Sequence, residues 1–204
     1  MVVAATLAAA LPTVKARVRA EAPSRDRVAL VVLLKGVNVG GHRRLKPSVL
    51  ARELAHLDVV NIGAAGTFVV RKPISQARLR EEFARRLPFA AHVAICQGRD
   101  ILRLLSRDWF AGQPARRDIV RFVTVLSTSP RVTPSLPLNA PATGTWMVRL
   151  IEREGRLVVG QYRRKMRVIR YLDTPDQVFG VPTTTRSWNT LNAIAKALEP
   201  TRQT

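Results

Sequence analysis

Three segments of this 204-residue chain contain residue types that bind anions or planar ligands. The first is a glycine-rich turn near position 36, the second is a run of basic and aromatic residues near 165, and the third is a polar segment with an arginine and a tryptophan near 188. Backbone N–H groups, guanidinium forks and aromatic faces recognise phosphate, carboxylate and flat rings. These residue types therefore favour binding of a negatively charged partner.

The glycine-rich turn has the sequence Gly-Val-Asn-Val-Gly-Gly at positions 36–41, between a predicted strand and a predicted helix. Backbone N–H groups and a helix dipole can bind an anion at such a place. The spacing matches neither a dinucleotide-binding loop nor a Walker loop. The alternative is that the glycines only permit positive φ at a tight turn. The candidate ligand-binding residues here are Lys35, Gly36, Asn38, Gly40 and Gly41.

The second segment, residues 162–171, alternates basic and aromatic side chains as YRRKMRVIRY. Such a surface pairs phosphates and stacks bases, which is typical of nucleic-acid binding. The alternative is a solvated strand edge or turn whose charges discourage edge-to-edge association. The candidate nucleic-acid-binding residues are Tyr162, Arg163, Arg164, Lys165, Arg167 and Tyr171.

The third segment, residues 184–190, has the sequence TTRSWNT and opens the last predicted helix. Its hydroxyl and amide side chains can cap the free N–H groups of that helix. Its arginine offers a fork for carboxylate or phosphate. The alternative is capping alone, with the tryptophan as a core anchor. The candidate ligand-binding residues are Arg186, Trp188 and Asn189.

The residue inventory for catalysis and metal binding is poor. The chain has no G-x-S-x-G elbow and no evident Ser/His/Asp set, so whether it is an enzyme is left open. The three histidines are dispersed and the single cysteine, Cys96, lies in an apolar segment that predicts an inert core thiol. We expect no metal site and no cofactor. One cysteine also favours a reducing, cytoplasmic location.

Charge is the strongest compositional signal, because 34 Lys and Arg residues against 14 Asp and Glu residues give a net charge of +20. A positive field of this size attracts nucleic acid or another polyanion. The alternative is compositional bias, since 28 of the 34 basic residues are arginine in a chain also rich in Ala, Val and Pro. No apolar stretch approaches the roughly 20 residues that span a bilayer.

Hydrophobic periodicity predicts two α+β halves. Residues 1–27 lack it and predict a disordered basic extension. Residues 28–112 predict strands and helices in a β-α-β-β-α-β-like order, with helices on one face of a sheet. Residues 113–204 restart the pattern, with a Pro-rich loop at 129–142, a hairpin around position 155 and a last helix. The oligomeric state is not indicated.

Three segments together, 33–41 (LLKGVNVGG), 61–70 (NIGAAGTFVV) and 184–190 (TTRSWNT), resemble a known pattern. In that pattern a strand leads into G-I-N-V-G-G, a Y-I-Q-S-G-N-V-V-F-like segment follows the first helix, and T-T-R-N-W-N-T lies near the end. The chain thus resembles the family of domain of unknown function 1697, as one continuous domain over about residues 28–198. The middle segment departs from the pattern, because Ala65 and Thr67 replace its Ser and Asn.

The resemblance implies a small bacterial cytoplasmic protein of two ferredoxin-like (β-α-β-β-α-β type) half-domains packed together, and it supplies no activity. The leading hypothesis for function is non-catalytic binding of an anionic partner, with nucleic acid first. The alternative is an enzyme or small-ligand-binding protein for a phosphate- or carboxylate-bearing metabolite, which requires the turn at 36–41 and the loop at 186–189 to converge. A third possibility is that the family segments only hold the two halves together.

Overall fold

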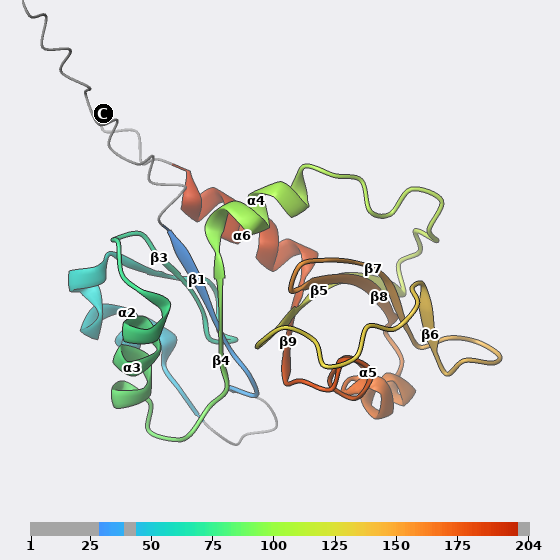
Figure 1. Ribbon diagram of the computed structural model, residues 1–204, viewed down its shortest axis with the longest axis horizontal. Helices are drawn as coiled ribbons and strands as arrows, with labels where there is room; N and C mark the ends of the chain where they lie inside the picture. Colours follow the sequence, from blue (N-terminus) through green and yellow to red (C-terminus); the bar gives the residue numbers. More distant parts are fainter. Residues whose placement is uncertain (1–28, 39–43, 200–204) are drawn as a thin grey trace, which may run out of the picture.

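The computed structural model describes residues 29–38 and 44–199, which form two antiparallel sheets with helices around them (Figure 1). The predicted extension at 1–27, Gly40 and Gly41 lie outside the described residues. None of the described helices is long and apolar enough to cross a membrane. The mixed content of helices and antiparallel sheets confirms the α+β class.

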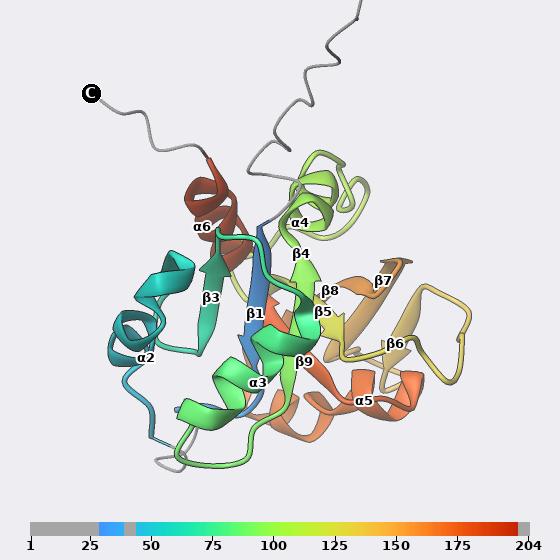
Figure 2. The same cartoon turned by 60° about the vertical axis from the view of Figure 1, so that its left-hand side comes forward.

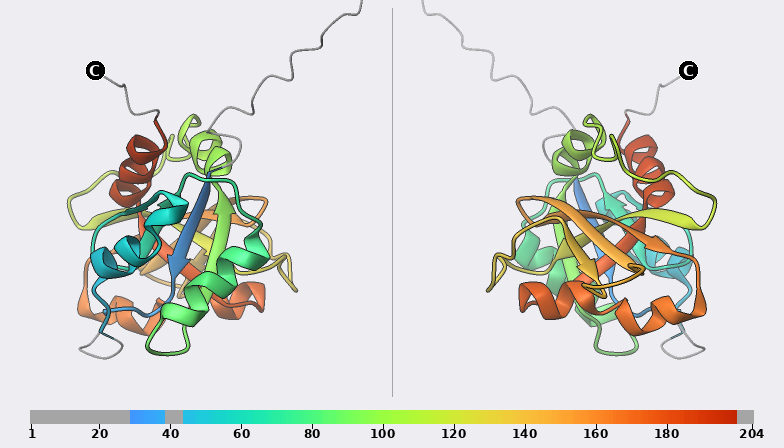
Figure 3. Two further views of the ribbon diagram at one scale, coloured as in Figure 1. Left: turned by 90° about the vertical axis from the view of Figure 1, so that its left-hand side faces the viewer. Right: turned by 90° about the vertical axis from the view of Figure 1, so that its right-hand side faces the viewer.

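The first sheet has four strands in the order β2-β3-β1-β4. These strands are β1 (Leu30–Leu34), β2 (Val59–Asn61), β3 (Thr67–Val70) and β4 (Val93–Gln97). Helices α2 (Pro47–Glu53) and α3 (Gln76–Arg86), with the short 3-10 helix η1 (Ala55–Leu57), cover one of its faces (Figure 3, left). Pro47 begins α2 as its spacing predicted, and the Ser75 hydroxyl caps α3 by accepting a hydrogen bond from the Arg78 N–H.

The second sheet has five strands in the order β6-β7-β8-β5-β9. They are β5 (Ile119–Leu126), β6 (Leu138–Ala140), β7 (Val148–Glu154), β8 (Leu157–Arg163) and β9 (Thr183–Ser187). The 3-10 helix η2 (Met166–Tyr171) and α5 (Thr174–Phe179) lie beside its outer face (Figure 3, right). Gly155, with φ +58°, makes the expected β7–β8 turn.

Side-chain alternation along β1 explains how the two sheets pack. Leu30, Val32 and Leu34 point towards α2 and α3, whereas Val31 and Leu33 belong to a central core shared by both sheets. That core is closed by α4 (Gly98–Leu105) and α6 (Trp188–Leu198), which lie together above the junction of the two sheets (Figures 1 and 2). The continuous burial of β1 on both faces, predicted from its apolar run, follows from this position.

The second half differs from the expected β-α-β-β-α-β order. Four strands, β5 to β8, precede its first helical element, because the chain between β5 and β7 forms β6 and irregular structure where the expected order needs a helix. The Pro-rich stretch 129–142 is also not loop throughout, since β6 lies within it and pairs with β7. The basic segment after Arg163 leaves the sheet and continues as η2.

Candidate functional site: a cavity where the two halves meet

A cavity of about 260 Å³ lies where the turn after β1 meets the second sheet. Lys35 and Gly36 come from the first half, and the rest of its wall comes from β5, β7, β8, β9 and the chain around η2 and α5. The cavity therefore depends on both halves and on segments more than 100 residues apart. Its wall in the second half includes Phe122, Val148, Tyr162, Tyr171, Leu172, Asp173, Pro175, Asp176 and Thr183 to Arg186.

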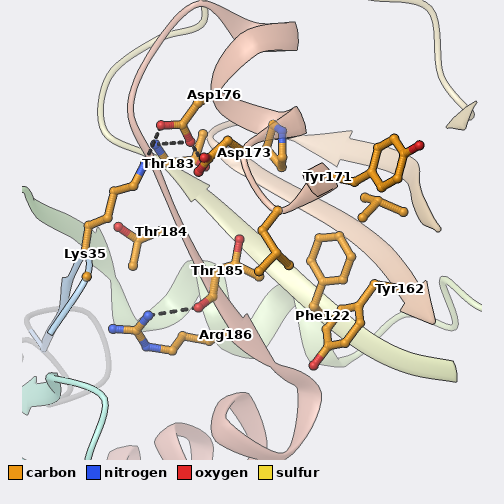
Figure 4. Close-up of a pocket in the computed structure, with 14 residues that line it drawn as sticks. Lys35, Phe122, Tyr162, Tyr171, Asp173, Asp176, Thr183, Thr184, Thr185 and Arg186 are labelled. Carbon is orange, nitrogen blue, oxygen red and sulfur yellow. Dashed lines mark hydrogen bonds and ion pairs between the residues drawn. The ribbon is translucent and has the colours of Figure 1, made fainter. Parts of the chain in front are cut away.

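One end of the cavity is polar. The Lys35 ammonium forms an ion pair with the Asp176 carboxylate, which lies in the first turn of α5 (Figure 4). The other oxygen of Asp176, Oδ1, accepts hydrogen bonds from the Thr183 N–H at 3.1 Å and the Thr183 hydroxyl at 2.5 Å. Asp176 thus fixes Lys35 and β9 relative to each other.

The opposite end of the cavity is aromatic, with Phe122, Tyr162 and Tyr171 across from Lys35 (Figure 4). The Phe122 and Tyr162 rings are tilted by 36° with centroids 5.9 Å apart. The Phe122 ring packs directly over Gly160, where a Cβ atom would lie 2.4 Å from Phe122 Cζ and clash. The site can therefore hold a flat apolar group against these rings and a polar group at the far end.

Arg186 lines the same cavity, but the residue is only 9% exposed and its side chain ties the halves together. Its Nε donates to the Thr67 hydroxyl at 2.7 Å, and its Nη2 donates to the carbonyls of Leu34 at 2.8 Å and Ala65 at 2.7 Å. Its Nη1 donates to the Thr185 carbonyl at 2.9 Å. The three segments that carry the family resemblance therefore meet at this guanidinium.

The charge of Arg186 has no carboxylate partner within the described ranges 29–38 and 44–199. Burial lowers the pKa of this guanidinium to about 10, so it still carries a full charge at neutral pH. The hydrogen bonds above use four of its five N–H groups. The fifth is the second N–H of Nη1, because the Thr185 carbonyl accepts only one of the two. The cavity is thus bordered by a buried positive charge.

Asn38 does not line the cavity and instead holds the glycine-rich turn in place. Its φ of +57° is left-handed, which asparagine tolerates. Its Nδ2 donates to the carbonyls of Leu45 at 3.0 Å and Ala64 at 2.7 Å, while its Oδ1 accepts from the Leu45 N–H at 2.8 Å. This side chain therefore links the first and second family segments by backbone contacts.

Trp188 and Asn189 also lie away from this cavity. The Trp188 ring packs edge to face on Phe110 with centroids 4.9 Å apart, and the Ser187 hydroxyl caps α6 by accepting from the Thr190 N–H at 3.4 Å. Trp188, Asn189 and Arg164 instead line a more open hollow of about 420 Å³ beside β5. Among the candidate residues that the structure describes, the two loops thus bring Lys35, Gly36 and Arg186 to one cavity, but not Asn38, Trp188 or Asn189.

The basic run at 162–171 does not form one surface. Arg163 pairs with Asp118 at 3.3 Å and its guanidinium stacks 4.5 Å from the centroid of the Trp146 ring, so it is engaged within the protein. Burial raises the pKa of Asp118, but the positive charges of Arg116 and Arg163 act against burial, and the pKa lies below its ordinary value. The two tyrosines line the cavity, whereas Arg164, Lys165 and Arg167 are exposed.

Sequence reasoning missed Phe122, Asp176 and Thr183 as wall residues. The hydroxyl-rich TTTR stretch before Arg186 was a usable signal for Thr183, but Asp176 had none, because only the fold brings it to Lys35. Cys96 is 2% exposed, and burial raises its pKa to about 12, as an inert core thiol requires. No cluster of three or more potential metal ligands occurs among the described residues.

Comparisons with known proteins identify the family and the fold. The family model described as a protein of unknown function, DUF1697, matches residues 28–154, which is more than half of the chain. A solved structure of a conserved bacterial protein from Streptococcus pneumoniae is similar, with a TM-score of 0.51 and 20% identity over 84% of this chain and 98% of that one. A comparison with curated proteins gave no match. The chain therefore belongs to the DUF1697 family of proteins of unknown function.

Proposed function

We propose that this protein binds a small molecule with a flat apolar body and one anionic group, in the cavity between the turn after β1 and β9. The observation that carries the proposal is that Lys35 and Arg186, 151 positions apart in the sequence, line one cavity whose far end is aromatic. A cavity of this kind, with few polar groups at one end, is typical of a ligand site. The proposal makes no claim of catalysis.

The expected position of the anionic group is beside Thr184, between Lys35 and Arg186 (Figure 4). A carboxylate or phosphate there would partly compensate the buried guanidinium charge, which lacks a carboxylate partner among the described residues. It would also compete with Asp176 for Lys35. The flat body would then lie against Phe122, Tyr162 and Tyr171.

A thermal-shift screen followed by calorimetry tests this proposal. The probes are benzoate, phenyl phosphate and adenosine monophosphate, each beside its uncharged parent: benzamide, phenol and adenosine. We expect at least one charged probe to stabilise the protein. Its uncharged parent should bind roughly tenfold or more weakly, because a charge-assisted contact is worth about 1.5–3 kcal/mol.

Matched variants make the screen specific to the cavity. Lys35→Met keeps the aliphatic stem and should weaken the charged probe, whereas Lys46→Met, at an exposed position before α2, should leave it unchanged. The double variant Lys35→Met/Asp176→Asn removes the ion pair as a unit and avoids an unpaired carboxylate. Binding that survives in both cavity variants, or no binding by any probe, would overturn the proposal.

Nucleic-acid binding through residues 162–171 stays a prediction. Exposed Arg164, Lys165 and Arg167 support it, whereas the inward positions of Tyr162 and Tyr171 remove the expected stacking groups. We also propose a ferredoxin-like arrangement for both halves. The strand order β2-β3-β1-β4 supports it in the first half, and the equivalent order β7-β8-β5-β9 supports it in the second, where β6 is added and the described chain lacks the helix between the first two strands of the motif. The reduced, buried Cys96 supports a cytoplasmic location.

A further inference from the structure

The 3-10 helix η2 presents an apolar row to solvent. Met166, Ile169 and Leu172 are 82%, 59% and 50% exposed. In a 3-10 helix residues three apart lie above one another, and Leu172 continues the helical backbone with φ −67° and ψ −26°. Outside this row, Val132 is the one large hydrophobic residue exposed in the described part of the chain. The row is thus a concentrated apolar face.

The other two rows of η2 differ in character. Val168 and Tyr171 face the protein, where Val168 joins the outer core of the second sheet. Arg167 and Arg170 share the third row, and Arg164 and Lys165 precede the helix. These four exposed basic residues make no ion pair with any described residue, and Asp173 is the nearest acidic residue along the chain. An exposed apolar row therefore lies next to a row of uncompensated positive charge.

We propose that this face of η2 binds the surface of an anionic lipid bilayer. Apolar side chains can enter the boundary between headgroups and acyl chains while adjacent arginines contact lipid phosphates. This pairing of features fits a bilayer better than it fits nucleic acid, because both tyrosines of the segment face inward and none of the exposed row can stack. A second copy of the chain is disfavoured, because it would bring two like-charged rows together.

Co-flotation of the full chain with vesicles tests the proposal. We expect binding to phosphatidylcholine vesicles that contain about one third phosphatidylglycerol, little binding to phosphatidylcholine alone, and weaker binding as salt increases. Met166→Ser/Ile169→Ser should reduce the partition coefficient by about tenfold or more. Neither residue lines the cavity, so thermal shifts by cavity probes should be unchanged. Val132→Ser, at an exposed apolar position elsewhere, is the matched control and should bind like the original chain.

The basic row has its own matched pair. Arg167→Gln/Arg170→Gln should lower the partition coefficient by about 25-fold, since each basic residue near an anionic surface contributes about fivefold. Arg52→Gln/Arg78→Gln, at exposed positions on α2 and α3, should change it much less. Absence of vesicle binding would overturn the proposal. Vesicle binding by Met166→Ser/Ile169→Ser that equals that of the original chain would also overturn it. A single-stranded oligonucleotide that displaces the original chain from vesicles, and that Met166→Ser/Ile169→Ser binds normally, would overturn it in favour of nucleic acid.

Discussion

Arg186 and the arginines of η2 carry the same charge in opposite environments. Arg186 is buried and donates to a hydroxyl and to backbone carbonyls from three segments of the chain. Arg167 and Arg170 are exposed and make no ion pair within the described ranges. The net charge of +20 therefore mixes two roles, one structural and one available for external partners. Substitution at each region separates them.

The largest expected effect is at Arg186. Arg186→Met should lower the free energy of unfolding by about 3 kcal/mol or more, because it leaves the Leu34 and Ala65 carbonyls and the Thr67 hydroxyl without their donor in a buried place. Arg167→Met is the matched control and should change that free energy by less than about 0.5 kcal/mol. Urea denaturation measures both. Equal destabilisation at the two positions would remove the distinction between buried and exposed charge.

Asn38 is expected to show a smaller effect of the same structural kind. Asn38→Ala removes the side-chain hydrogen bonds to Leu45 and Ala64. It also leaves alanine at φ +57°, a left-handed conformation that asparagine tolerates better. We expect a loss of about 1–2 kcal/mol in the free energy of unfolding. Asn38→Gly relieves the backbone cost and should lose less. If Asn38→Gly is the worse variant, the left-handed backbone is not the controlling feature.

The smallest expected effect concerns Cys96. Its pKa is about 12 in the folded protein against 9.0 for an ordinary thiol, because burial disfavours the thiolate. The unfolded chain therefore loses this proton first, and stability that is intact below pH 9 declines as the pH rises towards 12. At pH 9.5 the loss is less than about 1 kcal/mol. Urea denaturation of Cys96→Ala and of the original chain at pH 7.5 and 9.5 isolates the contribution of Cys96. If the free energy of unfolding depends on pH identically in the two proteins, the prediction is wrong.

Local signals predicted local structure well. The apolar run of β1, the proline at the start of α2, the Ser75 cap of α3 and the glycine of the β7–β8 turn each act through neighbouring residues, so their elements could be predicted from the sequence. The strand order of the second half could not, because it depends on which distant strands pair.

The candidate site was predictable only in part, for the same physical reason. Lys35 and Arg186 were recognisable as cations in unusual segments, but the Lys35–Asp176 pair joins positions 141 residues apart. Phe122 lines the cavity only because Gly160 stands opposite it in the neighbouring strand. The inward position of Tyr171 was missed because residues 166–171 form a helix rather than an extended segment, and that of Tyr162 because it depends on the pairing of β8 with β5.

The position of β9 in the chain has a consequence for biosynthesis. β9 follows every other strand, yet it supplies Arg186 and pairs with Phe122 to Leu126 of β5. While a ribosome is still making this region, the carbonyls that Arg186 later serves are open to water, and one edge of β5 has no neighbour. Such an edge invites association between nascent chains. Synthesis of β9 therefore both closes the vulnerable edge and completes the wall of the cavity.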